Sequence, residues 1–153
     1  ALFLGIDHTA IVVADTERSV AFYREGLGMT VAGAGENYGP EQERLNAVFG
    51  AHLRITTLRA SSGPGVELLE YLAPSTGRDM PADTRVNDLW SWRTVVRADD
   101  PAILAALRAG RARWLSAGPR SPGDRPERVI VADPDGHAIE LDLSTPPTGD
   151  DAD

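Results

Sequence analysis

The sequence contains no cysteine and no long apolar run. Without cysteine there can be no disulfide bond, no thiolate zinc site and no cysteine nucleophile. No apolar run reaches the roughly 20 residues that a bilayer-spanning helix requires. The N-terminus also lacks the basic start and small-residue cleavage pattern of a signal peptide. These absences predict a cytoplasmic protein with no membrane partner.

Positive charge and familiar catalytic motifs are also scarce. The chain has 15 Lys and Arg against 23 Asp and Glu, a formal net charge of -8. Such a surface repels nucleic-acid phosphates and anionic lipids. The sequence has no Gly-rich phosphate loop, no H-E-x-x-H zinc motif and no nucleophile elbow. We therefore expect a small-molecule ligand and no nucleic-acid partner.

What the sequence does contain is a repeated order of elements within 153 residues. Strands are expected at 5–15, 29–32, 52–59, 66–71, 89–97, 113–115, 128–132 and 138–143, with helices at 17–25 and 102–107. The chain therefore divides into a βαβββ module over 1–72, a linker over 73–88, a second βαβββ module over 89–143 and a disordered acidic tail over 144–153. This order predicts an α+β fold with helices on one face of each sheet.

His8 and Glu140 are the first candidates for chemistry, because of the strand faces that they share. His8 shares its face with small residues, which leaves room for a ligand. The alternative is a buried histidine with a hydrogen-bond partner. Glu140 lies opposite the apolar face of Ile139 and Leu141. Burying a carboxylate in a closed concavity costs free energy unless it is paired or bound to a metal. The alternative is that this face of the strand is exposed to solvent.

The strand at 66–71 carries one carboxylate on each face, Glu67 and Glu70. If Val66 and Leu68 face the helix, Glu67 lies on the same side of the sheet as the site. One histidine and two glutamates from three strands would suit a divalent Zn, Mn, Ni, Co or Fe ion.

Further residues are candidates for contact with a substrate. They are Trp90, Ser91, Trp92, Arg54, Arg93 and Tyr38. Trp90 and Trp92 share a face of the strand expected at 89–97, which allows stacking on a flat ligand or, alternatively, packing. The arginines could meet an anionic substrate or lie on the surface. Tyr38 falls in a Gly-rich segment, 33–43, that is expected to form a mobile loop.

Three motifs together resemble the vicinal-oxygen-chelate (glyoxalase/bleomycin-resistance/dioxygenase) superfamily. The segment Asp133–Leu141 is similar to its closing D-P-D-G-x-x-x-E-L signature. The opening Asp7–Asp15, with Phe22-Tyr23 and Leu27-Gly28, resembles its first module, and Val66–Leu69 its middle strand. The resemblance covers roughly residues 4 to 143.

The resemblance implies paired βαβββ modules that form a cupped, barrel-like mixed sheet with the helices outside and a metal in the cup. It implies His8, Glu67 and Glu140 as metal ligands. A fourth position, usually His or Gln, falls at Ser91 by alignment or at Trp92 by counting back from Asp99. Neither is a good ligand, so the sequence departs from the family pattern here. The resemblance also implies a homodimer.

Three interpretations of that departure stay open. Three protein ligands with water would keep a metal with open positions. Alternatively the metal is lost and the cup holds an organic ligand, or His8 or a glutamate acts as a metal-free acid or base. The expected function is a metal-dependent enzyme with His8, Glu67 and Glu140 as catalytic residues. Its chemistry would be isomerisation, a lyase reaction, or ring opening or closing. The alternative is a metal-free protein that sequesters a drug.

Overall fold

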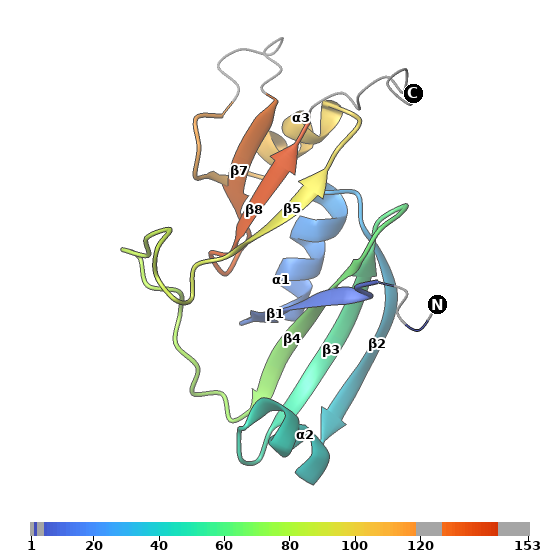
Figure 1. Ribbon diagram of the computed structural model, residues 1–153, viewed down its shortest axis with the longest axis vertical. Helices are drawn as coiled ribbons and strands as arrows, with labels where there is room; N and C mark the ends of the chain where they lie inside the picture. Colours follow the sequence, from blue (N-terminus) through green and yellow to red (C-terminus); the bar gives the residue numbers. More distant parts are fainter. Residues whose placement is uncertain (1, 3–4, 119–126, 144–153) are drawn as a thin grey trace. The chain divides into compact units, whose positions relative to one another are not determined.

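The computed structural model describes residues 2, 5–118 and 127–143, and divides into two compact units, Ala1–Asp83 and Thr84–Asp153. The boundary lies within the segment 73–88 that we expected as a linker. The tail expected at 144–153 lies outside the described residues. Each unit contains one four-stranded mixed sheet with its own helices (Figure 1). None of the described helices is both long enough and apolar enough to cross a membrane.

The first unit has seven elements in the described chain. They are β1 (His8–Val13), α1 (Thr16–Ala21), the π-helical turn η1 (Phe22–Gly26), β2 (Thr30–Tyr38), α2 (Pro40–Asn46), β3 (His52–Arg59) and β4 (Gly65–Ala73). The strand order is β1-β4-β3-β2, with β1 and β4 parallel and the other pairs antiparallel. The sheet is open, with β1 and β2 at its edges.

Helix α1 covers one face of this sheet. Its N-cap is Asp15, whose Oδ1 accepts a hydrogen bond from the Arg18 backbone N–H at 3.0 Å. Glu70 of β4 reaches the same helix start, where its Oε2 accepts from the hydroxyl of Thr16 at 2.6 Å. Leu68, two residues before Glu70 on the same face, is fully buried. The apolar side chains of this face therefore form the core, and Glu67 lies on the other face, as expected.

The segment 33–43 is not the loop that we expected. Strand β2 continues to Tyr38 and pairs with β3 along its length, and α2 begins at Pro40. Gly33 follows a register shift in the pairing, a place where glycine is common within strands. Gly39 has a φ of 92°, which allows the chain to turn from β2 into α2. Pairing with β3 thus overrides the weak strand preference of the glycines.

The second unit has five elements in its described part. They are β5 (Arg93–Arg97), α3 (Ala102–Ala109), β6 (Arg113–Trp114), β7 (Arg128–Ala132) and β8 (Ala138–Asp142). The strand order is β5-β8-β7-β6, with β5 and β8 parallel. The fold is therefore α+β as predicted, and its two sheets are open rather than closed into a barrel.

The first strand of the second unit begins four residues later than predicted. Residues 88–91 form a turn in which the Ser91 N–H donates to the Asp88 carbonyl at 2.9 Å, so strand pairing starts only at Arg93. Trp90 and Trp92 consequently precede β5 and do not share a strand face. The turn was not predicted from the sequence, because its apolar residues continue the pattern that is typical of a strand.

The closing signature forms the tight turn between β7 and β8. The Asp133 Oδ1 accepts hydrogen bonds from the backbone N–H of Asp135 at 3.0 Å and of His137 at 2.8 Å. Gly136 has a φ of 97°, a conformation that favours glycine. This part of the motif therefore has a structural role: it directs the chain into β8, which carries Glu140.

Candidate functional site

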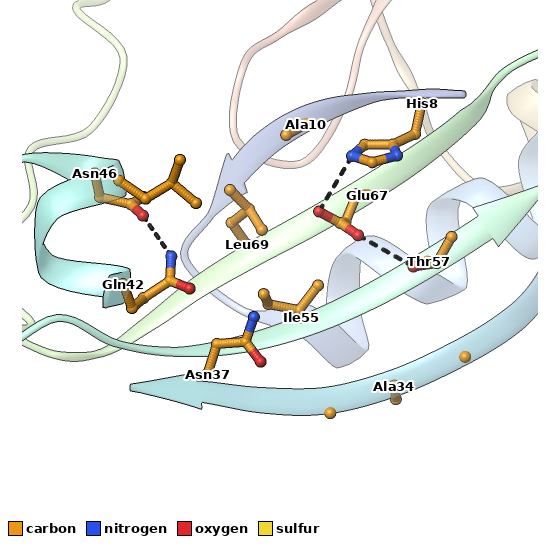
Figure 2. Close-up of a pocket in the computed structure, with 13 residues that line it drawn as sticks. His8, Ala10, Ala34, Asn37, Gln42, Asn46, Ile55, Thr57, Glu67 and Leu69 are labelled. Atoms are coloured by element: carbon orange, nitrogen blue, oxygen red, sulfur yellow. Dashed lines mark hydrogen bonds and ion pairs between the residues drawn. The ribbon is translucent and has the colours of Figure 1, made fainter. Parts of the chain in front are cut away.

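A cavity of about 550 Å³ lies on the open face of the first sheet, opposite α1 (Figure 2). All four strands of the sheet line it, and α2 contributes to one end. The middle is apolar, formed by Ala10, Ile55 and Leu69. The glycines Gly33 and Gly35 lie on the β2 side, where no side chain fills the space. Such a cavity is large enough for a small organic molecule.

His8 and Glu67 meet at one end of the cavity. The His8 Nε2 lies 3.6 Å from the Glu67 Oε2, and the two side chains are 40% and 21% exposed. The hydroxyl of Thr57 donates to the other oxygen, Oε1, at 3.3 Å. Figure 2 shows the three side chains in a row from β1, β4 and β3. Two of the three predicted catalytic residues thus lie together, and both remain accessible to a ligand.

Asp7 holds the other side of the His8 ring. The Asp7 Oδ2 lies 2.8 Å from the His8 Nδ1, and both Asp7 oxygens accept from Arg59 Nη2, at 2.8 and 2.9 Å. The hydrogen bond with His8, followed by that with Arg59, holds the pKa of Asp7 below its ordinary value of 3.8. An ionised carboxylate only accepts hydrogen bonds, so the Nδ1 carries the proton and the Nε2 faces Glu67.

Asp7 and Arg59 were not among the site residues predicted from the sequence. Asp7 stands next to His8 in the sequence, which was an available signal. Arg59 comes from the far end of β3, and only the sheet register brings it to Asp7.

The other end of the cavity is lined by amides. The Asn46 Nδ2 donates to the hydroxyl of Tyr71 at 2.7 Å, and Gln42 hydrogen-bonds to Asn46. Asn37 of β2 completes this end. Helix α2 supplies two of these amides, so they could not be placed while the segment 33–43 was expected to be a loop.

Two predicted substrate-binding residues do not line this cavity. Arg54 lies on the opposite face of the sheet, where its Nη1 is 3.1 Å from the Glu70 Oε2. Arg54 therefore pairs with the carboxylate that holds the start of α1, and its charge does not face the cavity. Tyr38 is the last residue of β2, is 72% exposed, and contacts the His52 ring edge-on at a centroid distance of 5.2 Å.

The second unit surrounds Glu140 with arginine instead of histidine. Glu140 is 6% exposed, and its Oε2 lies 2.7 Å from the Nε of Arg93. The Nη1 of Arg128 is 3.7 Å from the other oxygen. Glu140 is therefore the buried, paired carboxylate that the sequence suggested, and its nearest described partner is a cation.

The aromatic residues of this unit have other partners. The Trp92 ring lies 5.6 Å from the His137 ring, and the Trp90 Nε1 donates to Thr84 at 3.2 Å. Ser91 lies in the turn before β5.

The strand registers identify the residue that is equivalent to His8. In the first sheet Glu67 pairs with Ala10, two residues after His8, and in the second Glu140 pairs with Val95, two residues after Arg93. The aspartates before the two helices agree: Asp15, the N-cap of α1, follows His8 by seven residues, and Asp100, whose Oδ1 accepts from the Ala102 N–H at 2.8 Å, follows Arg93 by seven.

The structural equivalent of His8 in the second unit is therefore Arg93, and neither Ser91 nor Trp92, the two positions predicted for a fourth ligand. The count back from Asp99 gave a position one residue too early, because Asp100 and not Asp99 accepts the hydrogen bond from the start of α3.

The two units differ in how well their residues fit a divalent metal. Two donors that each lie about 2.1 Å from one tetrahedral ion are about 3.4 Å apart, close to the spacing of His8 and Glu67. Glu140 does not fit as a metal ligand, since its carboxylate is already paired with the guanidinium of Arg93. Within residues 2, 5–118 and 127–143, no three His, Cys, Asp or Glu side chains gather closely enough to hold a metal ion.

Comparison with known proteins gives a consistent result. The model of the Glyoxalase/Bleomycin resistance protein/Dioxygenase superfamily matches residues 5–141. No curated protein matches the chain.

Similar solved structures include a glyoxalase family protein from Bacillus cereus, with a TM-score of 0.75, 20% identity, and 93% of this chain and 96% of that chain covered. The trypanothione-dependent glyoxalase I of Leishmania major has a TM-score of 0.62 and 22% identity, over 92% and 86% of the two chains. The fosfomycin resistance protein FosX of Mesorhizobium loti has a TM-score of 0.57 and 16% identity, over 94% of each chain. At these identities the likeness concerns the fold.

Proposed function

The chain belongs to the glyoxalase/bleomycin resistance protein/dioxygenase superfamily, and we propose that it is an enzyme that moves a proton on a small oxygenated molecule. The observation that carries the proposal is the pair of His8 and Glu67, 3.6 Å apart at one end of a cavity. Proton transfer next to a carbonyl or hydroxyl group is a common step of isomerisation, of lyase reactions, and of ring opening or closing. One glyoxalase I and one resistance protein among the similar structures support a small-molecule substrate.

The residues around the pair define a role for each group. The carboxylate of Glu67 accepts a proton from the substrate, and the hydroxyl of Thr57 holds its other oxygen in place. Because the Nδ1 of His8 is held by Asp7, the Nε2 presents a lone pair to the cavity and becomes a donor once it is protonated. The amides at the far end hydrogen-bond to the remote part of the substrate, while the apolar middle excludes water.

A divalent ion is the cofactor that the resemblance implies, among Zn, Mn, Ni, Co and Fe. His8 and Glu67 would hold it, and when bound it would polarise a substrate oxygen. Glu140 as a third ligand stays a prediction from the resemblance, and its pairing with Arg93 argues against it.

Hydrogen exchange tests the proposal without knowledge of the natural substrate. A panel of α-hydroxyketones, which carry vicinal oxygens, is incubated with the protein in deuterated water, and NMR follows loss of the C–H signal next to the carbonyl. We expect exchange with the wild type and its loss in Glu67→Gln and His8→Ala.

Glu70→Gln is the matched control, because Glu70 lies on the same strand but on the opposite face. Exchange that survives in Glu67→Gln at the wild-type rate would contradict the proposal.

A second candidate is a binding protein that sequesters a drug. It is favoured by the pairing of Glu140 with Arg93, because the positions equivalent to His8 and Glu67 then hold an ion pair instead of two metal ligands. Such a protein would bind a compound with one-to-one stoichiometry and release it unchanged, which mass spectrometry of the recovered compound measures. The resemblance also implies a homodimer, which sedimentation analysis would test.

A further inference from the structure

Arg93 occupies a position where the first unit offers a metal ligand. It begins β5 and lies on the open face of the second sheet, opposite α3, together with Val95 and Glu140. The registers make it the equivalent of His8, and Glu140 the equivalent of Glu67. The two sheets therefore carry the same pair of positions with one residue exchanged.

The two pairs differ in chemistry as well as in geometry. His8 and Glu67 stand 3.6 Å apart, which leaves room for an ion between them, whereas Arg93 and Glu140 are in direct contact at 2.7 Å. A neutral imidazole offers a lone pair to a metal. A guanidinium is always protonated at physiological pH and offers none.

The burial of Glu140 strengthens the effect of its partner. The Glu140 side chain is 8% exposed, compared with 21% for that of Glu67. A buried carboxylate requires a cation or hydrogen-bond donors, and Arg93 supplies both. A divalent ion would have to displace this guanidinium and also tolerate its charge nearby.

We propose that Arg93 is a built-in cation that keeps divalent metal ions from Glu140. This one side chain decides that, of the two equivalent positions, only the pair in the first unit is competent to bind a metal. The inference does not depend on whether the first unit turns over a substrate.

Replacement of Arg93 by His tests the inference as a gain of function. The variant Arg93→His recreates in the second unit the residue types of the first. Co²⁺ is the probe, followed by its visible absorption spectrum and by titration calorimetry. We expect Co²⁺ affinity to rise about tenfold or more, because a positive charge has been replaced by a ligand. Adding Glu140→Gln to this variant should remove the gain.

Arg97→His is the matched control. Arg97 lies four residues further along β5 on the same face, and its side chain is 52% exposed, compared with 53% for Arg93. It is ion-paired with Asp99 at 3.6 Å rather than with Glu140. The control removes the same charge and adds the same ligand type on the same face, and should leave Co²⁺ affinity unchanged.

The inference is overturned if folded Arg93→His binds Co²⁺ no more tightly than Arg97→His. It is also overturned if Glu140→Gln lowers the Co²⁺ affinity of the wild type, because Glu140 would then already be a ligand. Circular dichroism confirms the fold of each variant. If Arg93→His does not fold, Arg93→Gln takes its place, since its amide still donates to Glu140 and its oxygen can bind the ion. The first-unit pair is identical in all variants, so differences in affinity report on the second unit.

Discussion

The two sheets follow the same plan but differ on their open faces. Both place their first strand parallel to their last and next to it, and both bury the opposite face against a helix. The first sheet has long middle strands and an extra helix, α2, which together form a cavity that contains the His8–Glu67 pair. In the second, β6 has only two residues and the Glu140 carboxylate is covered by arginine. The helix-facing sides are thus alike in the two sheets and specify the fold, whereas the functional side chains on the open faces differ.

The largest expected effect distinguishes the two glutamates at equivalent positions. Glu67→Gln should slow proton exchange by about 10²- to 10⁴-fold, the usual contribution of a general base. Glu140→Gln should have a much smaller effect, since its carboxylate is paired with Arg93. The exchange rate of each variant is measured by NMR on the same α-hydroxyketone. An equal loss of exchange rate in both variants would mean that the two open faces do not differ in this respect and that Glu140 is also a catalytic residue.

The next prediction concerns the helix-facing sides, where the two sheets should behave alike. Leu68 and Leu141 are equivalent by register and both are fully buried. Either change to Ala removes a buried side chain and leaves a cavity, so each should lower the free energy of unfolding by about 2–5 kcal/mol. Urea unfolding measures this loss.

The aromatic residues allow the two units to be followed separately. All three tryptophans lie in the second unit and all three tyrosines in the first. Leu141→Ala should therefore shift the transition seen by tryptophan fluorescence. Leu68→Ala should shift the transition seen by tyrosine absorbance. If both variants shift both probes equally, the units unfold together and the comparison applies to one cooperative core.

A smaller effect is expected at Glu70, which has no polar counterpart in the second unit. The register places Leu143 at the equivalent position. Glu70 accepts hydrogen bonds from the backbone and hydroxyl of Thr16 at the start of α1, so Glu70→Gln should cost about 1 kcal/mol, as helix caps do. The thermal midpoint measures the loss, with the exposed Glu25→Gln as control. An equal midpoint in the two variants would show that the carboxylate does not anchor the helix.

Sequence patterns predicted the elements that depend on local alternation. The strands at 52–59 and 128–132 have the predicted bounds. Apolar and polar residues alternate in much of the first, and the second is a short β-branched apolar run, so both patterns favour a strand. The extension of β2 was missed, because its glycines and polar residues are ordered by pairing with β3. Helix α2 was missed because the residue that it buries, Gln42, is polar.

The candidate site was predicted only in part, and for a related reason. His8 and Glu67 could be assigned to one face by counting along single strands. The equivalence of Arg93 with His8 depends on register between strands, and so does the contact of Arg59 with Asp7. Long-range register is not encoded in local alternation, so these partners became visible only in the folded chain.

The smallest predicted effect concerns Asp7, whose equivalent in the second unit is Trp92. Hydrogen bonds from His8 and then Arg59 hold the pKa of Asp7 below 3.8 in the folded protein. A lowered pKa stabilises the fold above the unfolded-state pKa, and this stabilisation is lost as pH falls through the folded pKa. Wild type should therefore exceed Asp7→Asn in stability at about pH 6, and the difference should shrink towards about pH 3. Urea midpoints at the two pH values measure it, and the exposure of the Asp7 side chain, 70%, keeps the effect small. A difference that stays constant on acidification would mean that the ionised carboxylate does not stabilise the His8 end of the cavity, and the contrast between Asp7 and Trp92 would then have no electrostatic part.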